Sequence, residues 1–295
     1  MINTELINKI LGKAISKAIS FDLLASVDSD RPNTLTYCTN EKYLSKALSN
    51  PNVKGIICHQ SLTKEILVNK DIIESDKPGY DFILLHNHVE RNRNNLKKSI
   101  INNSANIHPT AVISEFGVLI EEGVTIGPYV VVYPNVTIKS NTCIGAHSVL
   151  GCDDVEAKRS DLGFINTFHD GGLEVGSSCF VGSGVIIGRG VYGKTTLIGG
   201  NTFFSNNSFI SHNVTIGENC LILGAHICGS VEIGSNVTIN PKALISNGIK
   251  IGNNASILLG SVVISNVQNN KTVSGHYAIE HPRYLYKFVK LFGKI

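Results

Sequence analysis

The sequence predicts a mainly β fold: a left-handed parallel β-helix of hexapeptide repeats, with a small α/β domain before it and a helix after it. An aliphatic residue recurs every six positions over much of the chain, and the next residue is often glycine, as in "IGPYVV" and "IGENCL". Only 17% of the residues are charged, while 28 of the 295 are glycine. This composition favours β-structure with tight corners, because Gly and Asn tolerate positive φ.

The repeat can be followed from Ile107 to Val263, with several breaks in register. In a β-helix of this type each hexad forms one short strand and a corner, and three hexads form a coil of roughly 18 residues. The aliphatic side chains point inward and become buried only when coils stack. The expected inward positions are Ile107, Ile113, Ile120, Ile126, Val132, Ile138, Ile144, Leu150, Val175, Val181, Ile187, Ile198, Phe204, Ile210, Ile216, Ile222, Ile233, Ile239, Ile245, Ile251, Ile257 and Val263.

One segment interrupts the repeat. Residues 151–174 are polar and charged and do not fit the hexad register. An insertion into a solenoid leaves the coil as a loop on one face, and long loops in compact domains are often functional. We therefore divide the β-helix, residues 101–275, into coils and an inserted loop over 151–174.

The first 100 residues contain no hexads and predict a small α/β domain. The segment "ELINKILGKAISKAIS" (5–20) has the apolar spacing of an amphipathic helix, and "NEKYLSKAL" (40–48) predicts a second helix. "VKGIIC" (53–58) and "YDFILLH" (80–86) resemble short buried strands. The linker is expected at residues 91–99.

The chain ends in a basic, aromatic-rich segment, "HPRYLYKFVKLFGKI" (281–295). We expect residues 276–295 to form a helical cap that covers the last coil or packs on a neighbouring subunit, because an open β-helix end exposes a strand edge. Association of this helix with a membrane surface is an alternative.

Several function classes are disfavoured. "GRGVYGKT" (188–195) matches the phosphate-loop pattern, but a β-type sequence follows it where that motif requires a helix, so we reject an ATPase. A net charge of +3 without a basic tract in the middle of the chain argues against nucleic acid. No apolar run has transmembrane length, the start lacks a signal-peptide core, and the seven cysteines form no CxxC. We expect a cytoplasmic protein without stable membrane insertion.

Three segments carry a family resemblance. "ISHNVTIGENCLI" (210–222), "HDGGLEVGSSCFVG" (169–182) and "LTYCTNEKYL" (35–44) resemble parts of the UDP-3-O-acylglucosamine N-acyltransferases of lipid A assembly. The resemblance implies a homotrimer with His212 as catalytic residue, projecting at a corner towards a neighbouring subunit. It also implies a nucleotide-binding role for residues 1–100, through Tyr37, Asn40 and Tyr43.

The sequence also departs from this family. Many members have an acidic residue seven positions before the histidine, where this chain has Ser205, which leaves His212 without an acidic partner. Asn247 and Gly248 stand where a second histidine is expected. The segment 258–278 resembles the closing coil of coenzyme A-dependent hexapeptide acetyltransferases, including those that act on nucleotide-linked amino sugars.

A neutral imidazole suits proton removal from an amine that attacks a thioester, so His212 is the expected general base. A backbone N–H of Gly224 or Gly229 is expected to stabilise the oxyanion. His169 and Asn206 are candidate substrate contacts. The positive charges of Arg283 and Lys287 are candidates for binding the acyl donor.

The favoured hypothesis is an N-acyltransferase that moves an acyl group from acyl-CoA to the amino group of a dTDP- or UDP-linked amino sugar, for surface polysaccharide or glycan synthesis. The first alternative is lipid A N-acylation from acyl carrier protein, and the second is a non-catalytic trimeric scaffold. We expect no permanently bound cofactor and no metal. Zinc hydration is disfavoured because His212 and His226 are 14 positions apart and His276 and His281 lie beyond the hexads.

Overall fold

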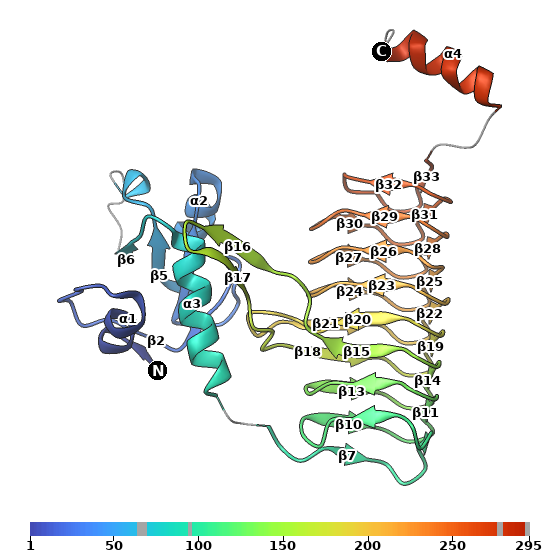
Figure 1. The fold of residues 1–295 in the computed structure, drawn as a ribbon, viewed down its shortest axis with the longest axis horizontal. Helices are drawn as coiled ribbons and strands as arrows, with labels where there is room; N and C mark the ends of the chain where they lie inside the picture. Colours follow the sequence, from blue (N-terminus) through green and yellow to red (C-terminus); the bar gives the residue numbers. More distant parts are fainter. Residues whose placement is uncertain (64–69, 94–95, 276–279, 293–295) are drawn as a thin grey trace.

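The coil and the N-terminal domain lie beside each other in a computed structural model of the chain, which describes residues 1–63, 70–93, 96–275 and 280–292 (Figure 1). His276, with the rest of residues 276–279, lies outside the described residues. The mainly β architecture, with a small α/β domain before the coil and a helix after it, confirms the predicted fold class.

Three parallel sheets form the coil, and each turn of the chain adds one strand to each sheet. The first sheet contains β7 (Ile100–Ile101), β10 (Val118–Ile120), β13 (Val136–Ile138), β18 (Gly172–Val175), β21 (Thr195–Ile198), β24 (Thr215–Ile216), β27 (Glu232–Ile233) and β30 (Lys250–Ile251). The second contains β8 (Asn106–Ile107), β11 (Thr125–Ile126), β14 (Cys143–Ile144), β19 (Phe180–Val181), β22 (Phe203–Phe204), β25 (Leu221–Ile222), β28 (Thr238–Ile239), β31 (Ser256–Ile257) and β33 (Thr272–Val273). The third contains β9 (Val112–Ile113), β12 (Val131–Val132), β15 (Val149–Cys152), β20 (Ile186–Gly188), β23 (Phe209–Ile210), β26 (His226–Ile227), β29 (Leu244–Ile245) and β32 (Val262–Val263).

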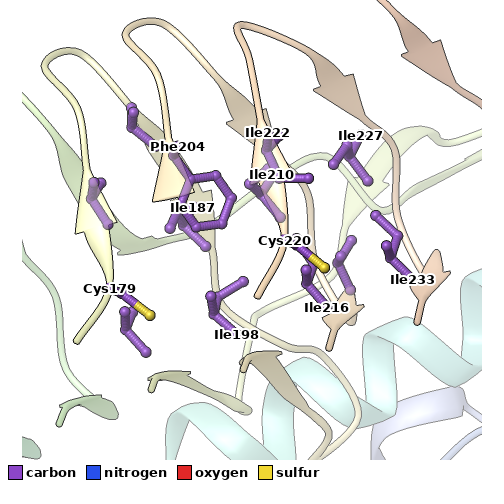
Figure 2. Close-up of a cluster of buried hydrophobic side chains, with 14 of the residues drawn as sticks. Cys179, Ile187, Ile198, Phe204, Ile210, Ile216, Cys220, Ile222, Ile227 and Ile233 are labelled. Atoms are coloured by element: carbon purple, nitrogen blue, oxygen red, sulfur yellow. The ribbon is translucent and has the colours of Figure 1, made fainter. Parts of the chain in front are cut away.

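The predicted inward positions form the core of the coil. Every one from Ile120 to Val263 is buried, while Ile107 and Ile113 at the first coil are partly buried. Figure 2 shows this interior, with side chains such as Phe204, Ile210 and Ile216 pointing inward from successive strands. The corners use residues with positive φ, mostly asparagine and glycine. Ile227 was missed as an inward position because it follows Ile222 after five residues instead of six.

The N-terminal domain has a four-stranded parallel sheet in the order β3 (Leu23–Leu24), β4 (Thr34–Cys38), β5 (Val53–Cys58) and β6 (Asp71–Glu74). A separate antiparallel pair joins β1 (Ile2–Asn3) to β2 (Ser20–Phe21). The predicted helix over 40–48 is confirmed as α2 (Glu41–Ser49), and a short 3-10 helix, η1 (Gln60–Leu62), follows β5. The predicted strand over 53–58 is confirmed as β5.

Two predictions in this domain were wrong. The first helix, α1 (Thr4–Leu11), ends at Gly12, whose φ of 63° and N–H bond to Asn8 form a left-handed cap, so it does not extend to residue 20. Residues 80–86 belong to helix α3 (Pro78–Arg91) and not to a strand. Most residues of α3 are buried, because the helix packs against the sheet on one side and against the insertion on another. A short run of mostly apolar residues has no clear periodicity, so it does not distinguish a buried helix from a buried strand.

The insertion leaves the coil after Cys152 and returns at Gly172, slightly inside the predicted limits of 151–174. It forms the antiparallel hairpin β16 (Ala157–Ser160) and β17 (Gly163–Asn166), which extends from the coil to α3 (Figure 1). Asn87 on α3 fixes it, donating to the Asn166 carbonyl at 2.8 Å and accepting from the Phe168 N–H at 2.7 Å. The insertion therefore joins the two parts of the molecule.

The phosphate-loop lookalike is a second connection. No helix follows it, because β21 begins at Thr195. Its Val191 and Tyr192 are buried in the core of the N-terminal domain, where the Tyr192 ring packs 5.3 Å from that of Phe82. The segment is a packing element of the domain interface.

The C-terminal helix, α4 (His281–Phe292), lies beyond the last coil and does not cover it within one chain (Figure 1). Its described apolar side chains Tyr286, Val289 and Leu291 are exposed. Packing on a neighbouring subunit stays a prediction. Within the described residues, no helix combines the length and hydropathy needed to cross a membrane.

Candidate functional site

His212 occupies a corner of the coil between β23 and β24. The next residue, Asn213, has a φ of 57° and turns the chain into the following strand. The His212 side chain was expected to project outward towards another subunit, but the residue is only 8% exposed. The difference arises because the insertion of the same chain covers this corner.

The insertion supplies the acidic partner that the sequence analysis did not find. Asp154 Oδ2 lies 3.3 Å from His212 Nδ1, and the Ser211 hydroxyl donates to the same oxygen. The expectation that His212 lacks a carboxylate partner was therefore wrong. Hydrogen bonding of Nδ1–H to Asp154 places the lone pair of the neutral ring on Nε2.

The surroundings of Asp154 keep its carboxyl group ionised. Burial alone would raise the pKa of this group, but hydrogen bonds from His212, Ser211 and the Val155 N–H outweigh burial and lower the pKa below its ordinary value. A carboxylate in this state orients an imidazole and stabilises the imidazolium that forms on proton uptake.

His169 supports Asp154 from inside the insertion. It is fully buried, its Nδ1 lies 3.0 Å from the Thr167 carbonyl oxygen, and its Nε2 accepts from the Asp154 N–H at 3.3 Å. Burial lowers the pKa of His169, which favours the neutral ring that these two bonds require. Its ring stands edge-on to His212 at 5.5 Å. Both ring nitrogens are engaged within the insertion, and a contact of His169 with the substrate stays a prediction.

A chain of charged groups connects His212 to the N-terminal domain. Glu156 Oε2 lies 3.6 Å from His212 Nε2, and Glu156 Oε1 lies 3.1 Å from Lys158 Nζ. Lys158 also lies beside Tyr37, since both side chains border Gly79, and its charge acts on the Tyr37 hydroxyl, while burial raises the pKa of Tyr37. None of Asp154, Glu156 and Lys158 was predicted as a site residue. The acidic start of the insertion, "CDDVEAK", is the sequence feature that could have indicated them.

The three candidate nucleotide-binding residues cluster where β4 leads into α2. Tyr37 is half-buried and packs 4.9 Å from Phe82, while Tyr43 is 44% exposed. Asn40 caps α2, since its Oδ1 accepts from the Tyr43 N–H at 3.1 Å. The Asn40 side chain is exposed, and its amide N–H donors take no part in this bond.

Gly229 lies in the coil next to His212. A Cβ on Gly229 would stand 2.7 Å from His212 Nε2, so the missing side chain leaves the free edge of the ring uncovered. Among the hydrogen bonds of the described residues, none uses the Gly229 N–H.

Other expected site residues lie elsewhere. The Gly224 N–H already donates to Ser208 at 3.1 Å, and Asn206 Oδ1 accepts from Ser183 N–H at 2.8 Å. Both residues stand at the corner after the second sheet, not at that of His212. Arg283 and Lys287 are exposed on α4, beyond the coil, and do not approach His212 within one chain (Figure 1).

A buried arginine near His212 was also not predicted from the sequence. Arg189 is 7% exposed and lies one coil before His212, with its guanidinium 2.6 Å from the Asp153 carboxylate. The pair holds the start of the insertion against the coil, next to the carboxylate that contacts His212.

Part of the coil matches the model of a known protein family. Residues 117–152 match the family model described as bacterial transferase hexapeptide (six repeats). No curated protein matches the chain. The insertion that reaches His212 lies outside the matched residues of this hexapeptide coil.

Solved structures of acyltransferases are similar to the chain over part of its length. One is LpxA from Acinetobacter baumannii, with 22% identity, 65% of this chain and 76% of that chain covered, and a TM-score of 0.45. Another is the UDP-N-acetylglucosamine acyltransferase from Campylobacter jejuni, with 19% identity, coverage of 64% and 85%, and a TM-score of 0.44. The acetyltransferase domain of PglB from Neisseria gonorrhoeae, in complex with acetyl coenzyme A, has 15% identity, coverage of 76% and 85%, and a TM-score of 0.24. All three TM-scores are below 0.5.

Proposed function

We propose that this protein is an N-acyltransferase that transfers an acyl group from acyl-CoA to the amino group of a UDP- or dTDP-linked amino sugar. The observation that carries the proposal is the pair of His212 and Asp154, with Nδ1 held by the carboxylate and Nε2 facing a glycine. This pair has the parts of a general base: an imidazole that is oriented at Nδ1 and can accept a proton at Nε2.

Each site group has a role in the reaction. The sugar amine attacks the thioester carbonyl, and His212 Nε2 accepts the proton that the amine loses. Asp154 and Glu156 stabilise the resulting imidazolium, because they lie 3.3 and 3.6 Å from the two ring nitrogens. The Gly229 N–H is the proposed oxyanion donor. The tetrahedral intermediate then collapses, the carbon–sulfur bond breaks, and the coenzyme A thiolate leaves and takes up a proton.

The nucleotide is proposed to bind at Tyr37, Asn40 and Tyr43. An aromatic face can stack on a pyrimidine, and an amide can pair with its polar edge. Lys158, on the insertion between this cluster and His212, supplies a positive charge for the diphosphate. The support is the continuous connection from Tyr37 through Lys158 and Glu156 to His212.

A homotrimer is proposed as the working assembly. On the second sheet, the outward side chains of Phe180, Phe203 and Leu221 are 45%, 43% and 39% exposed and follow one another on adjacent strands. A row of apolar side chains on a flat face favours burial against another subunit. A cytoplasmic location stays part of the proposal, and the free state of all seven cysteines supports a reducing compartment.

The test is an assay with a panel of UDP- and dTDP-amino sugars and acyl-CoA donors of different length, with product detection by mass spectrometry. The proposal expects one sugar to gain an acyl group while free coenzyme A appears. Acylation only from acyl carrier protein would favour the lipid A alternative. Failure of every nucleotide to bind and of every donor to react would contradict an enzyme and favour a scaffold.

A further inference from the structure

A second cluster of ionisable side chains lies at the junction of α3 and the insertion. His86, Glu90 and Asp170 each offer a ligand atom, and these atoms all lie within 4.8 Å of one another. His86 is fully buried, Glu90 is 8% exposed, and the Asp170 side chain is 11% exposed. The proposed acyl transfer makes no use of these groups.

One oxygen of the cluster lacks a partner. Asp170 Oδ1 is inaccessible to solvent and accepts no hydrogen bond from any described residue. A buried carboxylate oxygen in this condition is unfavourable unless a positive charge or a donor satisfies it. His86 Nε2 lies 3.5 Å from this oxygen and 3.0 Å from the carbonyl oxygen of Phe168.

These separations suit the edges of a metal coordination shell. Zinc binds nitrogen and oxygen ligands at about 2.0–2.2 Å in a tetrahedral arrangement, which places neighbouring ligand atoms about 3.3 Å apart. The observed separations of 3.5 Å and 3.0 Å around His86 Nε2 lie on either side of this value. His86, Glu90 and Asp170 supply three side-chain ligand atoms for such a shell.

Two cations act on the Glu90 carboxyl group. Arg93 Nη1 lies 3.2 Å from Glu90 Oε1, with its own side chain 41% exposed, and the charge of Arg31 also acts on Glu90. Lysine, arginine or N–H donors at the orphan oxygen of Asp170 are absent among the described residues.

We propose that His86, Glu90 and Asp170 form a structural site for a divalent transition-metal cation such as Zn²⁺, which ties the insertion to α3. The site goes beyond the proposed acyl transfer and does not depend on it. Its ligands join Asp170, next to His169, to two positions one helical turn apart on α3. The His-x3-Glu spacing was concealed while residues 80–86 were expected to form a strand.

The test uses the untagged full chain after treatment with a chelator. Zn²⁺ is titrated by calorimetry into the unaltered protein, Glu90→Gln and Asp170→Asn, with His88→Ala as a control. His88 is an exposed histidine on the same helix, two positions from His86, so it reports on adventitious binding to α3. Circular dichroism and the melting temperature of each variant show whether it folds.

We expect one Zn²⁺ per chain for the unaltered protein and His88→Ala, with at least about tenfold weaker binding in the other two variants. Zn²⁺ should raise the melting temperature only where it binds. Absence of saturable binding to the unaltered protein, or equal affinity in folded Glu90→Gln and Asp170→Asn, would overturn the proposal. A thiolate charge-transfer band on Co²⁺ addition would place the metal on cysteines and would also overturn it.

Discussion

Asp154 and His212 are 58 positions apart in the chain, yet the Asp154 carboxylate lies 3.3 Å from Nδ1 of the His212 ring. The first residue is in the insertion and the second is in the coil. The contact therefore depends on the path of a loop and on its attachment to α3. It converts an isolated histidine at a coil corner into an imidazole–carboxylate pair.

Replacement of Asp154 by asparagine should impair catalysis more than binding. We expect Asp154→Asn to lower kcat about 10- to 100-fold with little change in KM, because the substitution removes the charge that stabilises the imidazolium. Steady-state kinetics of acyl transfer measures both constants. Ser205→Ala is the control, since Ser205 occupies the family's acidic position, and it should stay within about twofold of the unaltered enzyme. A larger loss of kcat in Ser205→Ala than in Asp154→Asn would contradict the assignment of Asp154 as the partner of His212.

A methyl group on Gly229 should block the free edge of His212. The Gly229→Ala side chain would stand 2.7 Å from Nε2, so we expect at least about a tenfold loss of activity without loss of the fold. In Gly188→Ala the nearest atom is 3.4 Å from the new Cβ, and this variant serves as a control in a nearby coil. Full activity of Gly229→Ala would show that the substrate does not approach this edge.

The stability contributed by Asp154 should depend on pH. Its pKa is lower in the folded chain than the ordinary value of 3.8, because the hydrogen bonds from His212, Ser211 and the Val155 N–H outweigh burial. Such a group stabilises the fold above its unfolded pKa, and this contribution is lost as pH falls through the folded pKa. At neutral pH the free energy of unfolding should therefore be higher for the unaltered protein than for Asp154→Asn. Urea titrations should show that difference shrinking below about pH 4; a difference that grows on acidification would contradict the assignment.

Nucleotide binding should depend on the exposed aromatic ring of the N-terminal cluster. We expect Tyr43→Ala to weaken binding of UDP or dTDP about tenfold, as the loss of a stacking surface would do. Leu48→Ala, on the same helix, is a control for general damage to α2. Calorimetry with both nucleotides measures the effect. Equal affinities for the unaltered protein and Tyr43→Ala would remove Tyr43 from the site.

The coil was predictable because its signal is local. Most inward residues, such as Ile210, lie six positions from the next, and the corner residues, such as Asn213, indicate where the chain turns. The rejection of a phosphate loop at 188–195 had the same basis, since the following residues have strand periodicity. His212 could also be singled out from sequence, although the evidence for its role came from a resemblance.

The partners of His212 could not be predicted because they depend on tertiary structure. Nothing in the spacing of Asp154 or Lys158 indicates where a polar insertion will fold back. The incorrect strand at residues 80–86 had a further consequence, because α3 is the surface on which the insertion rests through Asn87. Without that helix, neither the covering of His212 nor the cluster around His86 could be inferred.

The central claim is that His212 acts as the base of an acyl transfer, and its most direct test is the rate of coenzyme A thiol release with the unaltered enzyme and His212→Asn. The assay uses the nucleotide-linked sugar that the panel identifies as acceptor, with circular dichroism to establish that both proteins fold. We predict that release requires the sugar and falls about 10²- to 10⁴-fold in His212→Asn. Release that stays within a few-fold of the unaltered enzyme would contradict the account.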